Sequence, residues 1–245
     1  MEPSWDRPDE FAAQTYEYEV NQSRCRTLEP VGPAGQVDLA ALGLAGIEFA
    51  AFKTQHRAGL GSDLLGMRTD TLTAEPGTVY RVDGDAYFVA LDVTEPLPFR
   101  DASVEWVYAE HLVEHIQLAD AVDWLAEVRR ILVPGGLLRL TTPDLRTYVE
   151  GYLHDTGFFD EHRRRLHTRS ADMPGRKAYV LNQIFYLWGH RWIYDLDELT
   201  HVLTRAGFAA GSVSPVAFRT GARRDVAVLD RASRKHETMY VEVTA

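Results

Sequence analysis

Phe88-Val89-Ala90-Leu91-Asp92 opens the stretch that decides the fold, and the stretch continues to Tyr148. Its first four residues form a short apolar run, which suits a parallel strand that is buried on both faces. Val104-Glu105-Trp106-Val107-Tyr108 is rich in β-branched and aromatic side chains and predicts a second strand. Residues 118–132 carry apolar side chains at helical spacing, and Pro134-Gly135-Gly136 ends that helix before a third strand. This order predicts an open, doubly wound, mostly parallel α/β sheet.

Polar residues follow two of these strands directly. Asp92 ends the first run, and Glu110-His111 follow the second. In an open α/β sheet, ligands bind in the crevice outside the carboxyl ends of the strands. We therefore expect Asp92 and residues 109–115 to line one crevice.

Several short motifs in this region, taken in order, closely resemble the central part of class I S-adenosylmethionine-dependent methyltransferases. They are Leu91-Asp92-Val93, Leu97-Pro98-Phe99, His111-Leu112-Val113-Glu114-His115 and Pro134-Gly135-Gly136. Trp188-Gly189-His190-Arg191, Tyr194-Asp195 and Ala206-Gly207-Phe208 resemble the C-terminal half of a bacterial subgroup of small methyltransferases. The resemblance implies a Rossmann-like fold with an antiparallel C-terminal hairpin and S-adenosylmethionine as the cofactor. It also implies methyl transfer to an oxygen or nitrogen atom of a small molecule or peptide, as a step of bacterial secondary metabolism.

The resemblance also implies the residues that hold the cofactor. Residues 57–62 lie where the family has its first glycine-rich loop, although residues 53–57 are more polar than a buried first strand and an ordinary turn is the alternative. Residues 67–70 could end a second strand, so that Asp70 resembles the ribose-binding acid, with Asp63 as its competitor. The expected cofactor-binding residues are Gly59, Gly61, Asp70, Asp92, Val93, Ala109 and Glu110.

Three histidines are candidates for the base that methyl transfer to an O–H or N–H group requires. A methyl sulfonium is already a strong electrophile, so the protein mainly aligns the acceptor and removes one proton. We rank His111 first, because it follows a strand that ends at the crevice, and we keep His190 as a second catalytic residue. His115 suits a structural role better, and a substrate-orienting role for His111 stays open.

Two other functions remain open. Residues 111–115 match the pattern His-x-x-Glu-His, in which two histidines of a zinc peptidase bind the metal, but the strand before the motif and the Pro-Gly-Gly turn after it fit the methyltransferase context. We therefore expect no metal. The irregular glycine segment also allows a protein that binds the cofactor but acts as a cyclase or as a non-catalytic binding protein.

The amino-acid composition indicates which kinds of partner the protein can bind. The 245 residues carry 26 Lys and Arg against 36 Asp and Glu, a formal charge of −10, which disfavours nucleic acid as a partner. Cys25 is the single cysteine, and the sequence has neither a secretory signal nor a long apolar run. We expect a cytoplasmic protein without a membrane partner, and a homodimer is an open alternative to a monomer.

The rest of the chain divides around this centre. We expect residues 1–38 to form an N-terminal arm or lid, and residues 39–245 to form the methyltransferase-like domain with an exposed insertion at about 154–180. Asp144 is a candidate cap for the next helix, and a later helix over 195–206 ends at Gly207. The aromatic residues of 180–192 belong either to the core or to the substrate wall, and two last strands fit 209–218 and 238–243.

Overall fold

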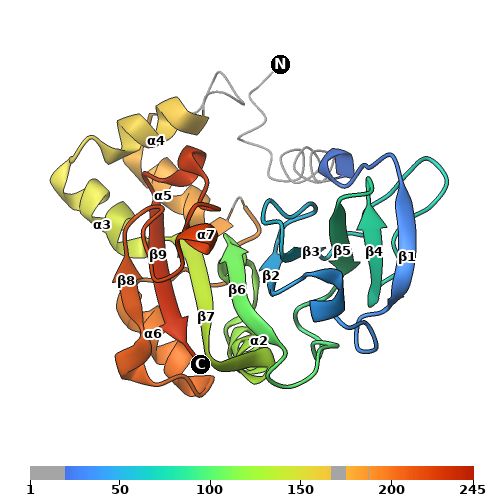
Figure 1. Ribbon diagram of the computed structural model, residues 1–245. Coiled ribbons are helices and arrows are strands. Elements are labelled where there is room, and N and C mark those ends of the chain that lie inside the picture. Colours follow the sequence, from blue (N-terminus) through green and yellow to red (C-terminus); the bar gives the residue numbers. More distant parts are fainter. Residues whose placement is uncertain (1–19, 167–174, 187) are drawn as a thin grey trace.

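The computed structural model describes residues 20–166, 175–186 and 188–245, and in these ranges nine strands form one mixed sheet (Figure 1). The order across the sheet is β1-β4-β5-β3-β2-β6-β7-β9-β8. The strands are β1 (Leu28–Pro33), β2 (Gly46–Phe49), β3 (Gly59–Asp63), β4 (Thr78–Val82), β5 (Ala86–Ala90), β6 (Val104–Glu110), β7 (Leu132–Pro143), β8 (Ser214–Val216) and β9 (Thr238–Thr244). The helices are α2 (Leu118–Ile131), α3 (Leu145–His154), α4 (Phe158–Leu166), α5 (Lys177–Tyr186), α6 (Leu196–Arg205) and α7 (Arg224–Ala227). None of the helices in these ranges is long and apolar enough to cross a membrane.

Five parallel strands form the centre of the sheet, in the order β5-β3-β2-β6-β7. Their buried faces explain the apolar runs, since β2 is buried at all four positions and β6 at five of seven. Antiparallel strands flank this centre on both sides: β9 and β8 follow β7, while β4 and β1 follow β5. The fold class and the C-terminal hairpin are as predicted.

The strand β1 corrects the predicted boundary of the N-terminal arm. It lies within 1–38, yet it pairs antiparallel with β4 and buries Leu28 against Tyr80 and Phe88. Pro30 and Pro33 are compatible with an edge strand, where a missing N–H does not interrupt the sheet. Residues 28–33 therefore belong to the sheet, and residues 1–19 of the predicted arm lie outside the described residues.

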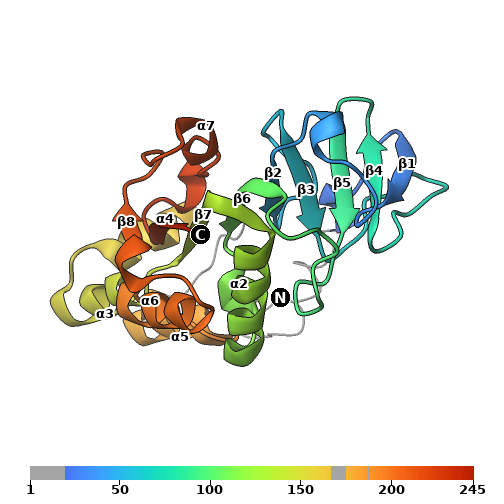
Figure 2. The same ribbon diagram turned by 60° about the horizontal axis from the view of Figure 1, so that its bottom comes forward.

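Helices α2 and α6 cover one face of β2, β6 and β7 (Figure 2). The buried positions of α2 recur at helical spacing and include Trp124, Leu125 and Val128, as the sequence predicts. Asp195 caps α6 by accepting a hydrogen bond from the Glu198 N–H at 2.9 Å, and Gly207 with φ 96° follows its end. The cap that Asp144 forms at α3 is also as predicted.

The predicted insertion is folded and forms a small core of its own. Phe159 of α4 and Val180 and Ile184 of α5 pack against Tyr148 of α3. Its charged run, residues 161–165, lies on the outer side of α4, except that His162 is buried. Residues 167–174 of this insertion lie outside the described residues.

On the other face of β6, β7 and β9, buried ion pairs hold a later segment of the chain against the sheet. Arg139 of β7 is fully buried, and its guanidinium donates to both carboxylate oxygens of Asp230, at 2.9 and 2.6 Å, and to Glu242 at 2.7 Å. The same guanidinium donates to the Thr220 carbonyl. Charge-assisted hydrogen bonds therefore hold segment 217–230 against this face of the sheet.

Candidate active site

The chain changes direction within the sheet between β2 and β6. From β2 it proceeds outward to β3 and β5, whereas from β6 it proceeds the other way to β7. Such a switch point leaves a crevice at the carboxyl ends of the two middle strands, which here are Phe49 and Glu110. Asp63, Leu91 and Thr141 lie at the same edge on the neighbouring strands.

Gly59 and Gly61 lie in strand β3 and not in a loop, so the predicted glycine-rich loop is wrong as a structure. The connection from β2 to β3 has no helix and folds back over β3. A Cβ on Gly61 would lie 2.9 Å from the Ala51 carbonyl oxygen and 3.0 Å from the Thr54 nitrogen. These glycines are needed because the returning chain passes close to the strand.

Glu48 holds this returning chain in place. It is buried in the middle of β2, and its carboxylate accepts hydrogen bonds from the Thr54 hydroxyl and from the His56 N–H at 3.0 Å. The polar residues 53–57 that argued against a buried strand are thus a turn stabilised by a buried acid. The ordinary turn that the sequence left as an alternative was given for residues 57–62, and most of these residues lie in β3 instead.

Asp63, and not Asp70, ends the second parallel strand. The Asp63 carbonyl accepts a hydrogen bond from the Leu91 N–H at 3.0 Å, which places it beside the end of β5. Asp70 lies in a loop, its side chain is 94% exposed, and it pairs with Arg24 at 3.6 Å. The strand expected at 67–70 is therefore absent from these residues, and Asp63 holds the position expected for a ribose-binding acid.

The remaining residues expected to bind the cofactor surround the same edge. Asp92 is exposed just beyond β5, where its carboxylate accepts hydrogen bonds from the Thr94 N–H at 3.0 Å and hydroxyl at 2.7 Å. Val93 and Ala109 face the main core. The Glu110 carboxylate bonds the N–H of Arg231 at 2.9 Å and pairs with its guanidinium, while burial raises the pKa of Glu110. Asp92 is the member of this set whose side chain faces solvent at the crevice edge.

His111 leaves β6 in the left-handed region, with φ 51°, and its ring is buried. Its Nε2 lies 2.9 Å from the Thr238 hydroxyl, and its Nδ1 lies 3.1 Å from Glu114 Oε1. Burial lowers the pKa of His111 to about 3, so the ring is neutral at pH 7. The residue is held rigidly at the crevice with little solvent access.

Glu114, His115 and His190 come together next to His111. The rings of His115 and His190 meet edge to face with centroids 4.8 Å apart. Glu114 is fully buried, and its Oε2 accepts a hydrogen bond from the Thr142 hydroxyl at 3.0 Å. Its carbonyl accepts the N–H of Arg191 at 2.6 Å, which brings the segment of His190 to the end of β6.

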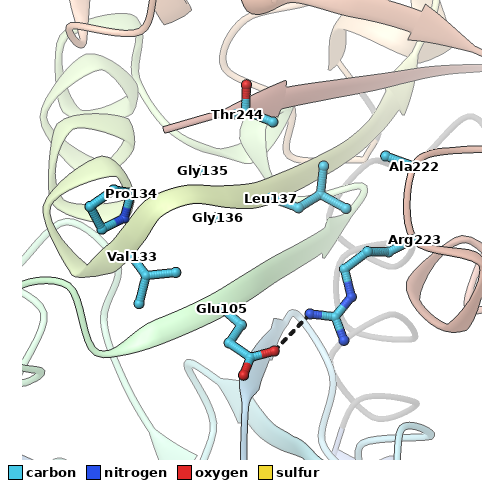
Figure 3. A pocket seen from close by; sticks show the side chains of 9 residues that line it. All are labelled: Glu105, Val133, Pro134, Gly135, Gly136, Leu137, Ala222, Arg223 and Thr244. Carbon is cyan, nitrogen blue, oxygen red and sulfur yellow. Dashed lines mark hydrogen bonds and ion pairs between the residues drawn. The ribbon is translucent and has the colours of Figure 1, made fainter.

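A cavity of about 450 Å³ lies at the opposite edge of the sheet (Figure 3). It is lined by the start of β6 and by Pro134, Gly135 and Gly136 of β7, which continue the strand where the sequence predicted a turn, and Arg223 pairs with Glu105 in its lining at 3.0 Å. The carboxyl ends of the parallel strands do not reach it. We therefore place the candidate active site at the switch point and not in this cavity.

The family comparison agrees with that placement. Residues 63–140 match the model of a methyltransferase domain, and the match runs from Asp63 at the end of β3 to β7. This part of the chain, less than half of its length, is similar to a methyltransferase domain.

The solved structures that are similar to this chain are distant. A methyltransferase from Haloferax volcanii, in complex with its Trm112 activator, is 18% identical with 83% of each chain covered and a TM-score of 0.43. One from Mesorhizobium loti is 16% identical, with 84% and 94% covered and a TM-score of 0.41. One from Thermotoga maritima, described as a "possible histamine N-methyltransferase", is 14% identical, with 98% and 99% covered and a TM-score of 0.44. No curated protein matches the chain.

The sequence did not reveal two parts of the candidate site. Thr238, which contacts His111, is 127 residues away in the chain, and no local pattern links the two. Glu114 was considered only as part of the His-x-x-Glu-His pattern, and its complete burial was not predicted. Asp63, which the sequence analysis named as the competitor of Asp70, is the last residue of β3.

Proposed function

We propose that this protein is an enzyme that uses S-adenosylmethionine to transfer a methyl group to an oxygen or nitrogen atom of a small-molecule or peptide acceptor of bacterial secondary metabolism. The observation that supports the proposal best is the shared edge of Asp63, Asp92 and the segment 110–115. The two acids flank the neighbouring ends of β3 and β5, while the histidines lie beyond β6. Cofactor and acceptor would then meet at the switch point.

In this proposal Asp63 accepts hydrogen bonds from the ribose hydroxyls, and Asp92 lies against the adenine. The glycines Gly59 and Gly61 contribute through the position of the returning chain. Ala109 and Val93 contribute backbone and packing, since both face the core. Asp70 has no part in it, because it is exposed in a loop.

His111 and His190 remain the proposed catalytic histidines. Both are neutral at pH 7, because burial lowers the pKa of each ring, and a neutral imidazole can accept a proton. His111 already has a protein partner at each ring nitrogen, which suits orientation of the acceptor better than free proton exchange. His190 is only half-buried and is the more accessible of the two.

Methyl transfer is tested by incubating the purified protein with methyl-labelled S-adenosylmethionine and extracts of bacterial cultures. We expect label in one or a few small products, and much less with His190→Ala. The control is His201→Ala, because His201 lies on the exposed side of α6. Saturable cofactor binding without label in any product would instead support a cyclase or a binding protein.

A further inference from the structure

Three metal-binding side chains converge at the crevice, and the proposed function uses only one of them. Glu114 and His115 lie on the 3₁₀ turn Val113–His115 just after β6, and His190 comes from the loop after α5. One donor atom from each lies within 4.8 Å of the others. The histidine pair of the zinc-peptidase pattern, His111 with His115, is not the pair that converges here. His190 takes the place of His111.

The hydrogen bonding of His190 prepares one nitrogen to bind a metal. Its Nδ1 contacts the Ile184 carbonyl oxygen, and a carbonyl can only accept a hydrogen bond. Nδ1 therefore carries the ring hydrogen. Nε2 is left with a lone pair. Histidines that bind metals are usually fixed by such a bond to a backbone carbonyl.

Glu114 has a buried carboxylate oxygen that lacks a hydrogen-bond donor among the described residues. Thr142 donates to Oε2, but Oε1 receives no hydrogen bond. Its near neighbour is His111 Nδ1 at 3.1 Å.

A buried carboxylate oxygen without a donor is unfavourable unless a positive charge lies close by. His115 is exposed, so an ion and a further ligand can reach the group from solvent. We propose that Glu114, His115 and His190 bind a divalent transition-metal ion at the crevice. One carboxylate and two imidazoles suit zinc, iron, cobalt or nickel better than magnesium or calcium. This replaces the expectation of no metal.

The role of the ion rests on the proposed function, specifies the acceptor as a hydroxyl compound, and makes His190 a ligand of the ion in place of a proton acceptor. Three protein ligands leave coordination positions open, and a hydroxyl bound there has a lowered pKa. The hydroxyl releases its proton to solvent water, and its oxygen attacks the methyl carbon. The sulfur–methyl bond breaks with its electron pair remaining on sulfur, so the sulfonium becomes a neutral thioether.

Metal binding is measured first, without any methyl transfer. The protein is stripped with a chelator, dialysed and titrated with Co²⁺, and binding is followed by visible absorption and calorimetry. We expect one tight equivalent in the full chain, and at least about a tenfold weaker site in His115→Ala and in His190→Ala. His115 is exposed, so its variant should fold normally. Glu114→Gln serves as the third variant, with folding checked by circular dichroism.

The matched control is a second group of ligands, His162, His236 and Glu237, with His162 Nδ1 2.9 Å from His236 Nε2. His162→Gln should leave the tight equivalent unchanged. The proposal is overturned if the full chain binds no Co²⁺ at millimolar concentration, or if His162→Gln removes the site and His115→Ala does not.

The role of the metal ion in methyl transfer is tested separately, by measuring label transfer. Chelation should abolish label transfer to a hydroxyl acceptor, added metal should restore it, and affinity for S-adenosylmethionine should change less than about twofold. Full turnover by the stripped protein would refute this role. Metal binding with the expected variant pattern, but with no methyl transfer under any condition, would leave the site standing and refute the proposed function.

Discussion

The two halves of the sheet, a regular half in residues 104–143 and an irregular half in residues 28–103, reach the same edge by different routes. In residues 104–143, strand, helix and strand follow one another, and α2 buries a regular apolar face. In residues 28–103, strands β1 to β5 are joined by loops, and the helical segment described there is the 3₁₀ turn Ala40–Leu42 (Figure 1). The comparison shows that a strand end can be positioned by a buried acid and two glycines where a helix is usual.

The largest effect is expected in the regular half, from removing the buried cation. Arg139→Met leaves Asp230 and Glu242 buried without their partner, which should lower the free energy of unfolding by about 3–5 kcal/mol. Denaturant unfolding measures it. Arg146→Met is the control, because Arg146 forms an exposed pair with Glu150 and should cost less than about 1 kcal/mol. Equal effects would show that the Arg139 network does not hold the segment 217–230.

Truncation tests whether the irregular half needs its first strand. Deleting residues 1–38 removes β1, exposes the edge of β4 and loses the buried Leu28, so we expect a loss of about 2–5 kcal/mol in thermal or denaturant unfolding. Deleting residues 1–19 leaves β1 in place and should change the unfolding free energy much less. A fully stable 39–245 fragment would restore the predicted arm boundary.

The variant Gly61→Ala tests whether Gly61 is needed for packing in the irregular half or for the approach of the cofactor to the backbone. The added methyl meets backbone atoms of the returning chain, so we expect a loss of about 1–3 kcal/mol in unfolding free energy. Gly211→Ala is the control, because its methyl would meet nothing within 4 Å. If Gly61→Ala instead weakened cofactor binding at unchanged stability, the glycine would act as the sequence first suggested.

The free energy of unfolding should also depend on pH, through a buried histidine of the insertion. Burial lowers the pKa of His162 to about 4, below the value of about 6.5 in an unfolded chain. The unfolded state therefore binds the proton first, and this contribution is present above pH 6.5 and is lost as the pH falls toward 4. The two pKa values correspond to at most about 3 kcal/mol over that window, and we expect a flatter pH profile in His162→Gln. A wild-type profile in the variant would assign the acid loss to other groups.

These regions differ in how far the sequence predicts them. The pattern predicted β5, β6, α2 and the ends of α6, because in these the apolar spacing, the cap and the terminating glycine agree. It did not predict β1, whose alternation is obscured by two prolines, or the turn held by Glu48, because that depends on a contact across the fold. The same difference holds for the candidate site. The sequence predicted the position of His111 because this residue directly follows a strand, whereas the positions of Glu114 and Thr238 depend on tertiary packing.

The central claim is that S-adenosylmethionine is bound at the carboxyl edge, where the irregular half ends in Asp63. Calorimetric titration of the cofactor into Asp63→Asn tests it most directly, with Asp70→Asn as the matched exposed control and Arg223→Ala as the control at the opposite cavity. We predict at least about tenfold weaker binding for Asp63→Asn, since a hydrogen bond to a charged group contributes about 1.5–3 kcal/mol, and unchanged binding for both controls. Wild-type affinity in Asp63→Asn, together with loss of binding in Arg223→Ala, would contradict the claim.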